Sequence, residues 1–171
     1  MVDENFKKVM QANTGCVVVM AGSGSDREHI EEVTKSLDKY EIPHRVRICS
    51  GHKQAKKLMR IIEEYNAVGG LVAYVAVAEG TDSLSGILSY HAFGPVISSP
   101  PDAPNESCLR NPPGSSNSYI ARPVNVGKFI AQIYAGVNPR FKELLEIEKV
   151  KKLDSLEKAD AEFLERYGEG K

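Results

Sequence analysis

Short runs of consecutive apolar residues alternate along the chain with longer segments in which apolar residues recur every three or four positions. The runs predict strands at residues 16–20, 46–49, 71–77, 95–98 and 119–121. The first and third runs are apolar at every position, not at alternate ones. That pattern is typical of strands buried on both faces, as in a parallel sheet.

The segments between the predicted strands have helical periodicity. The first helix begins near Ser25 or Asp26, either of which can cap it, and Ser25 and Glu28 have capping-box spacing. Further helices are predicted across residues 58–65 and 126–134, with a short one between the third and fourth strands. Strands that alternate with helices in this way predict a three-layer α/β/α sandwich around a central parallel sheet, a flavodoxin-like architecture.

Three parts of the chain are expected: a polar lead-in at 1–15, the α/β domain at 16–137, and a C-terminal extension of one or two amphipathic helices at 138–171. A terminal amphipathic helix must bury its apolar stripe, either on its own domain or on a neighbouring subunit. Because the α/β core looks complete without the extension, we expect packing on a neighbouring subunit. The apolar residues of the extension are Phe141, Leu144, Leu145, Ile147, Val150, Leu153, Leu156, Phe163 and Leu164.

The 171 residues (18.8 kDa) suit one domain. A formal charge of −1 argues against a non-specific nucleic-acid binder, which needs a basic field. No stretch resembles a membrane span or a secretory signal. The three cysteines, Cys16, Cys49 and Cys108, form neither a disulfide framework nor a zinc pattern. We therefore expect a reduced, cytoplasmic protein.

Candidate chemistry lies after the predicted strands, at residues 21–26, 50–53, 78–82 and 98–114. In open parallel sheets, ligands bind outside the carboxyl ends of the strands. The first of these turns, from Gly22 to Asp26, suits a phosphate, because its glycines permit close backbone approach and a helix begins there. It lacks the third glycine of a dinucleotide fingerprint and the lysine of a Walker loop.

The second turn places His52, which could move protons near neutral pH, beside Lys53, which could neutralise a phosphate. Arg110 lies in a long proline-rich segment, has no obvious carboxylate partner nearby in sequence, and could clamp a phosphate. His29 is expected on the exposed side of a helix. No two histidines have metal-ligand spacing with a carboxylate, so no metal is expected.

Together these turns resemble the aminoimidazole ribonucleotide carboxylases of purine biosynthesis, the PurE family. Residues 22–26 match the family's Gly-Ser-x-Ser-Asp, and residues 50–53, Ser-Gly-His-Lys, match its Ser-Ala-His followed by Arg or Lys. Residues 76–78, Ala-Val-Ala, and 107–114, Ser-Cys-Leu-Arg-Asn-Pro-Pro-Gly, are similar to the second class of the family, which uses carbon dioxide. The resemblance extends in order from about Cys16 to Val137.

The resemblance implies that the chain binds aminoimidazole ribonucleotide and adds a carboxylate from carbon dioxide to a ring carbon, without cofactor or metal. His52 would carry the proton at that carbon. It also implies a homo-octamer with terminal helices packed across subunits. The residues that the resemblance assigns to the substrate are Gly22, Ser23, Ser25, Asp26, Ser50, Lys53, Ala78, Glu79, Gly80, Ser107 and Arg110.

One loop departs from the family. Residues 78–82 read Ala-Glu-Gly-Thr-Asp, where the second class has Ala-Gly-Arg-Ser-Asn around its carbon dioxide pocket. The added carboxylates of Glu79 and Asp82 disfavour a developing carboxylate. The open alternatives are a non-catalytic or altered-specificity ribonucleotide-binding protein, a mutase that moves the carboxylate from the substituent nitrogen, and a flavin- or nucleotide-binding module of another family.

Overall fold

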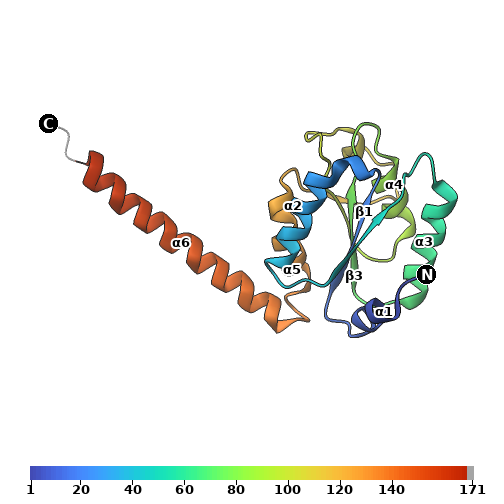
Figure 1. Ribbon diagram of the computed structural model, residues 1–171, viewed down its shortest axis with the longest axis horizontal. Coiled ribbons are helices and arrows are strands. Elements are labelled where there is room, and N and C mark those ends of the chain that lie inside the picture. Colours follow the sequence, from blue (N-terminus) through green and yellow to red (C-terminus); the bar gives the residue numbers. More distant parts are fainter. Residues whose placement is uncertain (169–171) are drawn as a thin grey trace.

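The computed structural model describes residues 1–168, in which five parallel strands form one sheet of order β2-β1-β3-β4-β5 (Figure 1). The two central strands are buried along their whole length. This confirms the parallel sheet expected from continuous apolar runs. The strands are β1 (Cys16–Ala21), β2 (His44–Ile48), β3 (Val72–Val77), β4 (Val96–Ser98) and β5 (Ser118–Tyr119).

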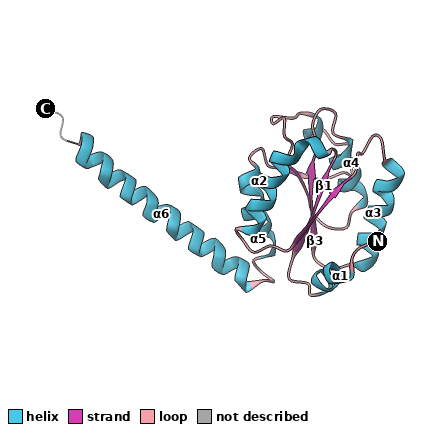
Figure 2. Ribbon diagram, in the orientation of Figure 1, coloured by secondary structure: helices cyan, strands magenta, loops and turns pink. Residues whose placement is uncertain are grey.

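Helices cover both faces of the sheet and give the expected three layers (Figure 2). One face packs against α1 (Glu4–Gln11), α3 (Ala55–Val68) and α4 (Ser83–His91). The other face packs against α2 (Arg27–Asp38) and α5 (Val126–Tyr134). Alternate residues of β1 and β3 enter the two cores, because successive side chains of a strand point to opposite faces.

The expected capping of α2 by Ser25 and Glu28 is wrong. A 3₁₀ turn at Gly24–Asp26 precedes the helix, and the Ser23 hydroxyl caps that turn by accepting from the Ser25 N–H at 3.2 Å. Asp26 stands at the N-cap of α2 but makes no side-chain capping bond. The helical turn is therefore capped by Ser23, two residues before the Ser25 cap that the pattern indicated.

The N-terminal lead-in contributes to the core. Asp3 accepts the Phe6 N–H at 3.0 Å and so begins α1. Phe6 and Met10, one turn apart, are buried against α3 and the sheet. The Phe6 ring meets Tyr65 edge-on with centroids 6.4 Å apart. The polar appearance of residues 1–15 reflects only the outer face of this helix.

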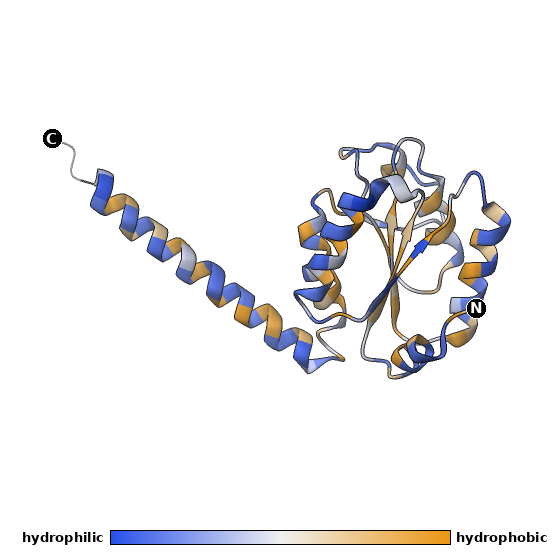
Figure 3. Ribbon diagram, in the orientation of Figure 1, coloured by the Kyte–Doolittle hydropathy of each residue, from blue (hydrophilic) through white to orange (hydrophobic). Residues whose placement is uncertain are grey.

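The C-terminal segment forms one helix, α6 (Pro139–Tyr167), which projects away from the sheet (Figure 1). Its first turns pack on the domain, since Phe141 and Leu144 are buried beside α5. The expectation that the core is complete without this segment is therefore wrong. Beyond Leu145 the helix carries a mixture of apolar and charged residues along its length (Figure 3), and its large apolar side chains are exposed.

Two sequence expectations concern the remaining chemistry of the chain. All three cysteines are free thiols and are buried, as is common for cysteine in protein cores. Within residues 1–168, no helix combines the length and the apolar character needed to cross a lipid bilayer.

The close packing of α5 on α2 gives a first prediction. A Cβ on Gly127 would overlap the Ser36 carbonyl oxygen, and the Gly127 N–H already donates to the Ser36 hydroxyl at 3.0 Å. Gly127→Ala should therefore lower the free energy of unfolding by about 1–3 kcal/mol, the usual effect of overpacking. Urea denaturation measures this loss.

Gly136→Ala is the matched control, because no atom lies within 4 Å of its Cβ position. Its denaturation midpoint should stay near that of the parent chain. Equal midpoints for the two variants would contradict the assigned packing of α5 on α2.

Candidate functional site

The segments after β1, β2 and β4 are fixed to neighbouring strands by backbone hydrogen bonds that continue the sheet past the strand ends. The Gly22 N–H donates to Val77 O, and the Cys49 N–H donates to Ala21 O, both at 2.8 Å. The Ser99 N–H likewise donates to Ala76 O at 2.9 Å. Three of the four segments expected at the carboxyl edge therefore start from fixed positions, and the fourth, residues 78–82, follows Val77, whose carbonyl accepts the Gly22 N–H.

A cavity of about 120 Å³ lies where these turns meet. It is small beside the roughly 300–1,000 Å³ of typical ligand pockets, so it can enclose only a small ring or a few small groups. The residues that line it are Gly22, Ser23, Asp26, Ser50, Gly51, His52, Ala78, Glu79, Thr81, Ser83 and Leu84. Seven of the predicted site residues are thus brought together: Gly22, Ser23, Asp26, Ser50, His52, Ala78 and Glu79.

The first turn presents hydroxyl and carboxylate groups. Ser23 Oγ accepts from Ser25 N–H at 3.2 Å and lies 2.7 Å from Ser25 Oγ. The Ser25 hydroxyl also lies 3.3 Å from Asp26 Oδ1. Asp26 Oδ2 is buried and has no hydrogen-bond partner within residues 1–168. Since a buried carboxylate oxygen without a partner is costly, this atom is suited to accept a ligand hydroxyl or amine.

The second turn holds the exposed imidazole of His52, and the preceding residue, Gly51, packs closely on α4. Ser50 Oγ accepts the Lys53 N–H at 3.2 Å, which closes the turn around His52. Gly51 packs on the start of α4, where an added Cβ would overlap Ser83 Oγ and lie 3.0 Å from the Leu84 N. The absence of a side chain at Gly51 therefore lets the His52 turn approach α4.

The third turn makes the cavity acidic. Ala78 is buried, and Glu79 is exposed at the cavity rim. With Asp26, Glu79 provides a second carboxylate among the lining residues. Of residues 1–168, those that line the cavity include no lysine or arginine. Any cation for a phosphate must therefore come from outside the cavity.

Five predicted site residues do not line the cavity: Ser25, Lys53, Gly80, Ser107 and Arg110. Ser25 and Lys53 belong to the first two turns and are exposed. Arg110 is exposed too, and its Nη2 donates to Glu106 Oε2 at 2.9 Å. The expectation that Arg110 lacks a nearby carboxylate is wrong, because Glu106 lies four residues before it.

Gly80 contributes through its backbone N–H and Ser107 through its hydroxyl. The Gly80 N–H donates to Asp102 Oδ2 at 2.8 Å, and Ser107 Oγ accepts the Asp82 N–H at 2.9 Å. Both contacts join the third turn to the proline-rich segment. The Ser107 hydroxyl oxygen thus already has a partner in the protein.

Sequence reasoning missed part of the lining and misplaced one histidine. Ser83 and Leu84 line the cavity from the first turn of α4. Their only sequence signal was proximity to the end of β3. His29 is half-buried, and its Nε2 lies 2.9 Å from Ser99 O, so the expectation of an exposed position is wrong.

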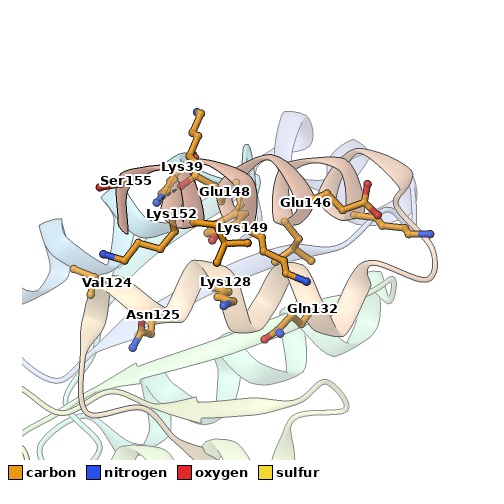
Figure 4. A pocket seen from close by; sticks show the side chains of 15 residues that line it. Lys39, Val124, Asn125, Lys128, Gln132, Glu146, Glu148, Lys149, Lys152 and Ser155 are labelled. Atoms are coloured by element: carbon orange, nitrogen blue, oxygen red, sulfur yellow. Dashed lines mark hydrogen bonds and ion pairs between the residues drawn. The ribbon is translucent and has the colours of Figure 1, made fainter. Parts of the chain in front are cut away.

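A larger groove, of about 740 Å³, lies elsewhere, between α5, α6 and the end of α2 (Figure 4). Glu148 there pairs with Lys39 and with Lys151, and these contacts hold the pKa of the Glu148 carboxyl below its usual value. The groove lies away from the strand ends. Among residues 1–168, those that line it include no histidine but six lysines: Lys39, Lys128, Lys142, Lys149, Lys151 and Lys152. We therefore assign the chemistry to the smaller cavity.

The fold and cavity define an α/β protein with a candidate ligand site at the carboxyl edge of a parallel sheet, where a histidine and two carboxylates line the cavity. A family model described as AIR carboxylase matches residues 16–154. The chain belongs to the AIR carboxylase family. This confirms the resemblance seen in the turn sequences.

Curated relatives agree with this assignment. Phosphoribosylaminoimidazole carboxylase of Archaeoglobus fulgidus is 30% identical over 85% of this chain and 83% of its own length. That of Treponema denticola is also 30% identical, over 70% of this chain and 79% of its own length. The rat bifunctional phosphoribosylaminoimidazole carboxylase/succinocarboxamide synthetase is 34% identical over 96% of this chain. The chain spans only 42% of that rat protein and 33% of its human counterpart.

Solved structures share the fold. The crystal structure of Treponema denticola PurE matches with a TM-score of 0.77 at 24% identity, over 91% of this chain and 99% of that one. A variant of that protein gives a TM-score of 0.81, also at 24% identity, over 86% of this chain and 97% of that one. The flavodoxin-like arrangement expected from the sequence is confirmed.

The contact between Gly51 and α4 gives a second prediction. Gly51→Ala should lower the free energy of unfolding by about 1–3 kcal/mol, because the backbone of Leu84 must shift to admit the methyl group. Thermal unfolding reports the change. Ser83→Ala should restore part of the loss when combined with Gly51→Ala, since it removes the overlapping hydroxyl.

Gly24→Ala serves as the control, because the space around Gly24 is open. It should leave the melting temperature nearly unchanged. Equal melting temperatures for Gly51→Ala and Gly24→Ala would refute the close contact between Gly51 and the start of α4.

Proposed function

We propose that this protein is a phosphoribosylaminoimidazole carboxylase that uses carbon dioxide to carboxylate a ring carbon of aminoimidazole ribonucleotide. The observation that carries the proposal is the meeting of the Ser23–Asp26 turn and His52 in one cavity, in a chain of the AIR carboxylase family. The small cavity would take the imidazole ring. The ribose and phosphate would lie over the exposed turns outside it.

The electron-rich aminoimidazole is itself the nucleophile of this reaction. Its ring carbon attacks carbon dioxide, a carbon–carbon bond forms, and the proton on that carbon passes to the imidazole of His52. The products are the carboxylated ribonucleotide and one proton, which leaves through the exposed side of His52. The protein orients the ring, keeps water from carbon dioxide and accepts one proton, and positioning of this kind supplies much of such a rate enhancement.

The polar groups around the cavity are distributed as this ligand requires. The Asp26 Oδ2 atom without a partner would accept a ribose hydroxyl, and the hydroxyls of Ser23, Ser25 and Ser50 would donate to the phosphate or the sugar. Lys53 would supply the cation that the cavity lacks. Arg110 would exchange Glu106 for the phosphate at little cost, since an exposed ion pair contributes only about 0.2–1 kcal/mol.

A second candidate function rests on Glu79. A carboxylate at the cavity rim, together with Asp26, opposes the negative charge that develops during carboxylation. Both carboxylates would be compatible with a protein that binds a ribonucleotide whose ring carries a neutral or cationic substituent. Incubation with aminoimidazole ribonucleotide and bicarbonate separates the two functions, because binding without carboxylation favours the second.

The role of His52 gives a third prediction. His52→Asn should lower kcat at least a hundredfold and leave substrate affinity within about tenfold, because proton transfer is separable from binding. Steady-state carboxylation assays and calorimetric titration with the ribonucleotide measure the two effects.

His44→Asn is the matched control. His44 lies at the N-terminal end of β2, at the end of the sheet away from the cavity, and its Nδ1 lies 3.0 Å from Ile42 O. Its kinetics should match those of the parent chain. If His52→Asn weakens binding but preserves the maximal rate, the acid–base role is excluded.

We further propose that copies of this chain assemble into a homo-octamer and that α6 contributes to it. In a single copy of the chain, four apolar side chains of α6 are 36–56% exposed: Ile147, Val150, Leu153 and Leu156. Of these, Leu153 lines the groove that contains the lysines, while the distal part of α6 carries an excess of acidic residues. Apolar residues and complementary charges of this kind suit a second copy. We also propose that the reaction takes place in the cytoplasm.

Removal of residues 147–171 tests this assembly and gives a fourth prediction. The truncation keeps Phe141 and Leu144, which belong to the core, so the shortened chain should still fold. It should sediment as a smaller species than the intact chain. Intact and shortened chains with equal subunit numbers would exclude a role for α6 in assembly.

A further inference from the structure

We propose that Asn105 is a positioning residue, which holds the Glu79–Asp82 loop against the cavity without touching the ligand. Asn105 is only 5% exposed and does not line the cavity. The kinetic part of this inference rests on the proposed carboxylase function, whereas the structural part does not.

Asn105 uses its side chain fully. Its Nδ2 donates to Gly80 O at 2.9 Å and lies 3.0 and 3.1 Å from the two carboxylate oxygens of Asp102. Its Oδ1 accepts the Ser107 N–H at 2.9 Å. A single amide thus joins the loop after β3 to both ends of the segment 102–107.

Asp102 and Gly80 complete the first half of this network. The Gly80 N–H donates to Asp102 Oδ2 at 2.8 Å, so both polar backbone groups of Gly80 are bound. Gly80 has φ +66° and no atom within 4 Å of a Cβ position, so packing does not hold it. Burial alone would raise the pKa of Asp102, but hydrogen bonds from Asn105 and Gly80 outweigh it and lower the pKa, which keeps the acceptor ionised.

Ser107 completes the second half. Its Oγ accepts the Asp82 N–H at 2.9 Å, and Asp82 Oδ1 in turn accepts the Ser85 N–H at 2.9 Å and caps α4. The segment itself is anchored to the sheet, because the Asn105 N–H donates to the Tyr119 hydroxyl of β5 at 3.1 Å. The start of α4 is therefore held in place by the segment 102–107, on the side away from the cavity.

This network reaches the site through two routes. Glu79 and Thr81, on either side of Gly80, line the cavity. Ser83 and Leu84, which follow Asp82, line it too and pack on Gly51, next to His52. Loosening Asn105 would therefore move the cavity wall and the support of the His52 turn, and would leave the Ser23–Asp26 turn in place.

The kinetic consequence follows from that division. Apart from Arg110, the groups proposed to hold ribose and phosphate belong to the first two turns, whereas the loop faces the proposed site of carboxylation. Asn105→Ala should lower kcat at least tenfold and change the KM for the ribonucleotide less than threefold. Hydrogen exchange at the Gly80 and Asp82 amides should become at least tenfold faster.

Asn66→Ala is the matched control. Asn66 lies on α3, is half-buried where Asn105 is buried, and joins two backbone groups, since it donates to His91 O at 2.8 Å and accepts the Phe93 N–H at 3.3 Å. These two groups lie at and just beyond the C-terminal end of α4, away from the cavity. It should lose a similar amount of thermal stability while both kinetic constants and exchange at Gly80 and Asp82 stay unchanged.

Ser107→Ala provides a second test that survives if Asn105→Ala fails to fold. As part of the network it should lower kcat with little change in KM and speed exchange at Asp82. A raised KM with an unchanged kcat would instead assign Ser107 to the substrate and overturn this inference.

The remaining outcomes are also decisive. Asn105→Ala with parental kcat, or with unchanged exchange at Gly80 and Asp82, would overturn the positioning role. If the parent chain itself shows no carboxylation, the proposed function fails. Exchange at Gly80 and Asp82 in Asn105→Ala and Asn66→Ala still decides whether Asn105 holds the loop.

Discussion

The hydrogen bonds that extend the sheet beyond its strand ends are the contacts on which the site depends. Gly22 donates to the end of β3, and Cys49 donates to the end of β1. Each bond fixes the first residue of a turn at a neighbouring strand, in a buried setting where an unpaired backbone group is costly. Short turns can then present Ser23, Ser50 and His52 around one small cavity.

Much of this arrangement could be predicted from local patterns. The continuous apolar runs at 16–20 and 71–77 fixed the central strands, because only strands covered on both faces tolerate such runs. The order of strands and helices then placed His52 and the Ser23–Asp26 turn at the same edge. The chemistry of the site was therefore accessible from residue types together with topology.

The parts that escaped prediction depend on long-range polar contacts. The partners of Gly80 and Asp82 lie 22 and 25 residues away, and hydrogen bonds of that separation leave no periodic signal. The same holds for His29, whose partner Ser99 is 70 residues distant. The packing of α6 was predicted only in part for a related reason. A single helix places Phe141 in the core and extends its remaining length away from the domain, and its apolar pattern does not show where one part ends and the other begins.

The hydrogen bonds by which the segment 102–107 supports the Glu79–Asp82 loop have an evolutionary consequence. Residues 102, 105 and 107 shape the cavity wall without forming part of it. Mutational drift at these three positions can adjust the site in small steps while every group that meets the ligand is retained. A family built on this plan can thus diversify its chemistry through residues that a comparison of active-site side chains alone would overlook.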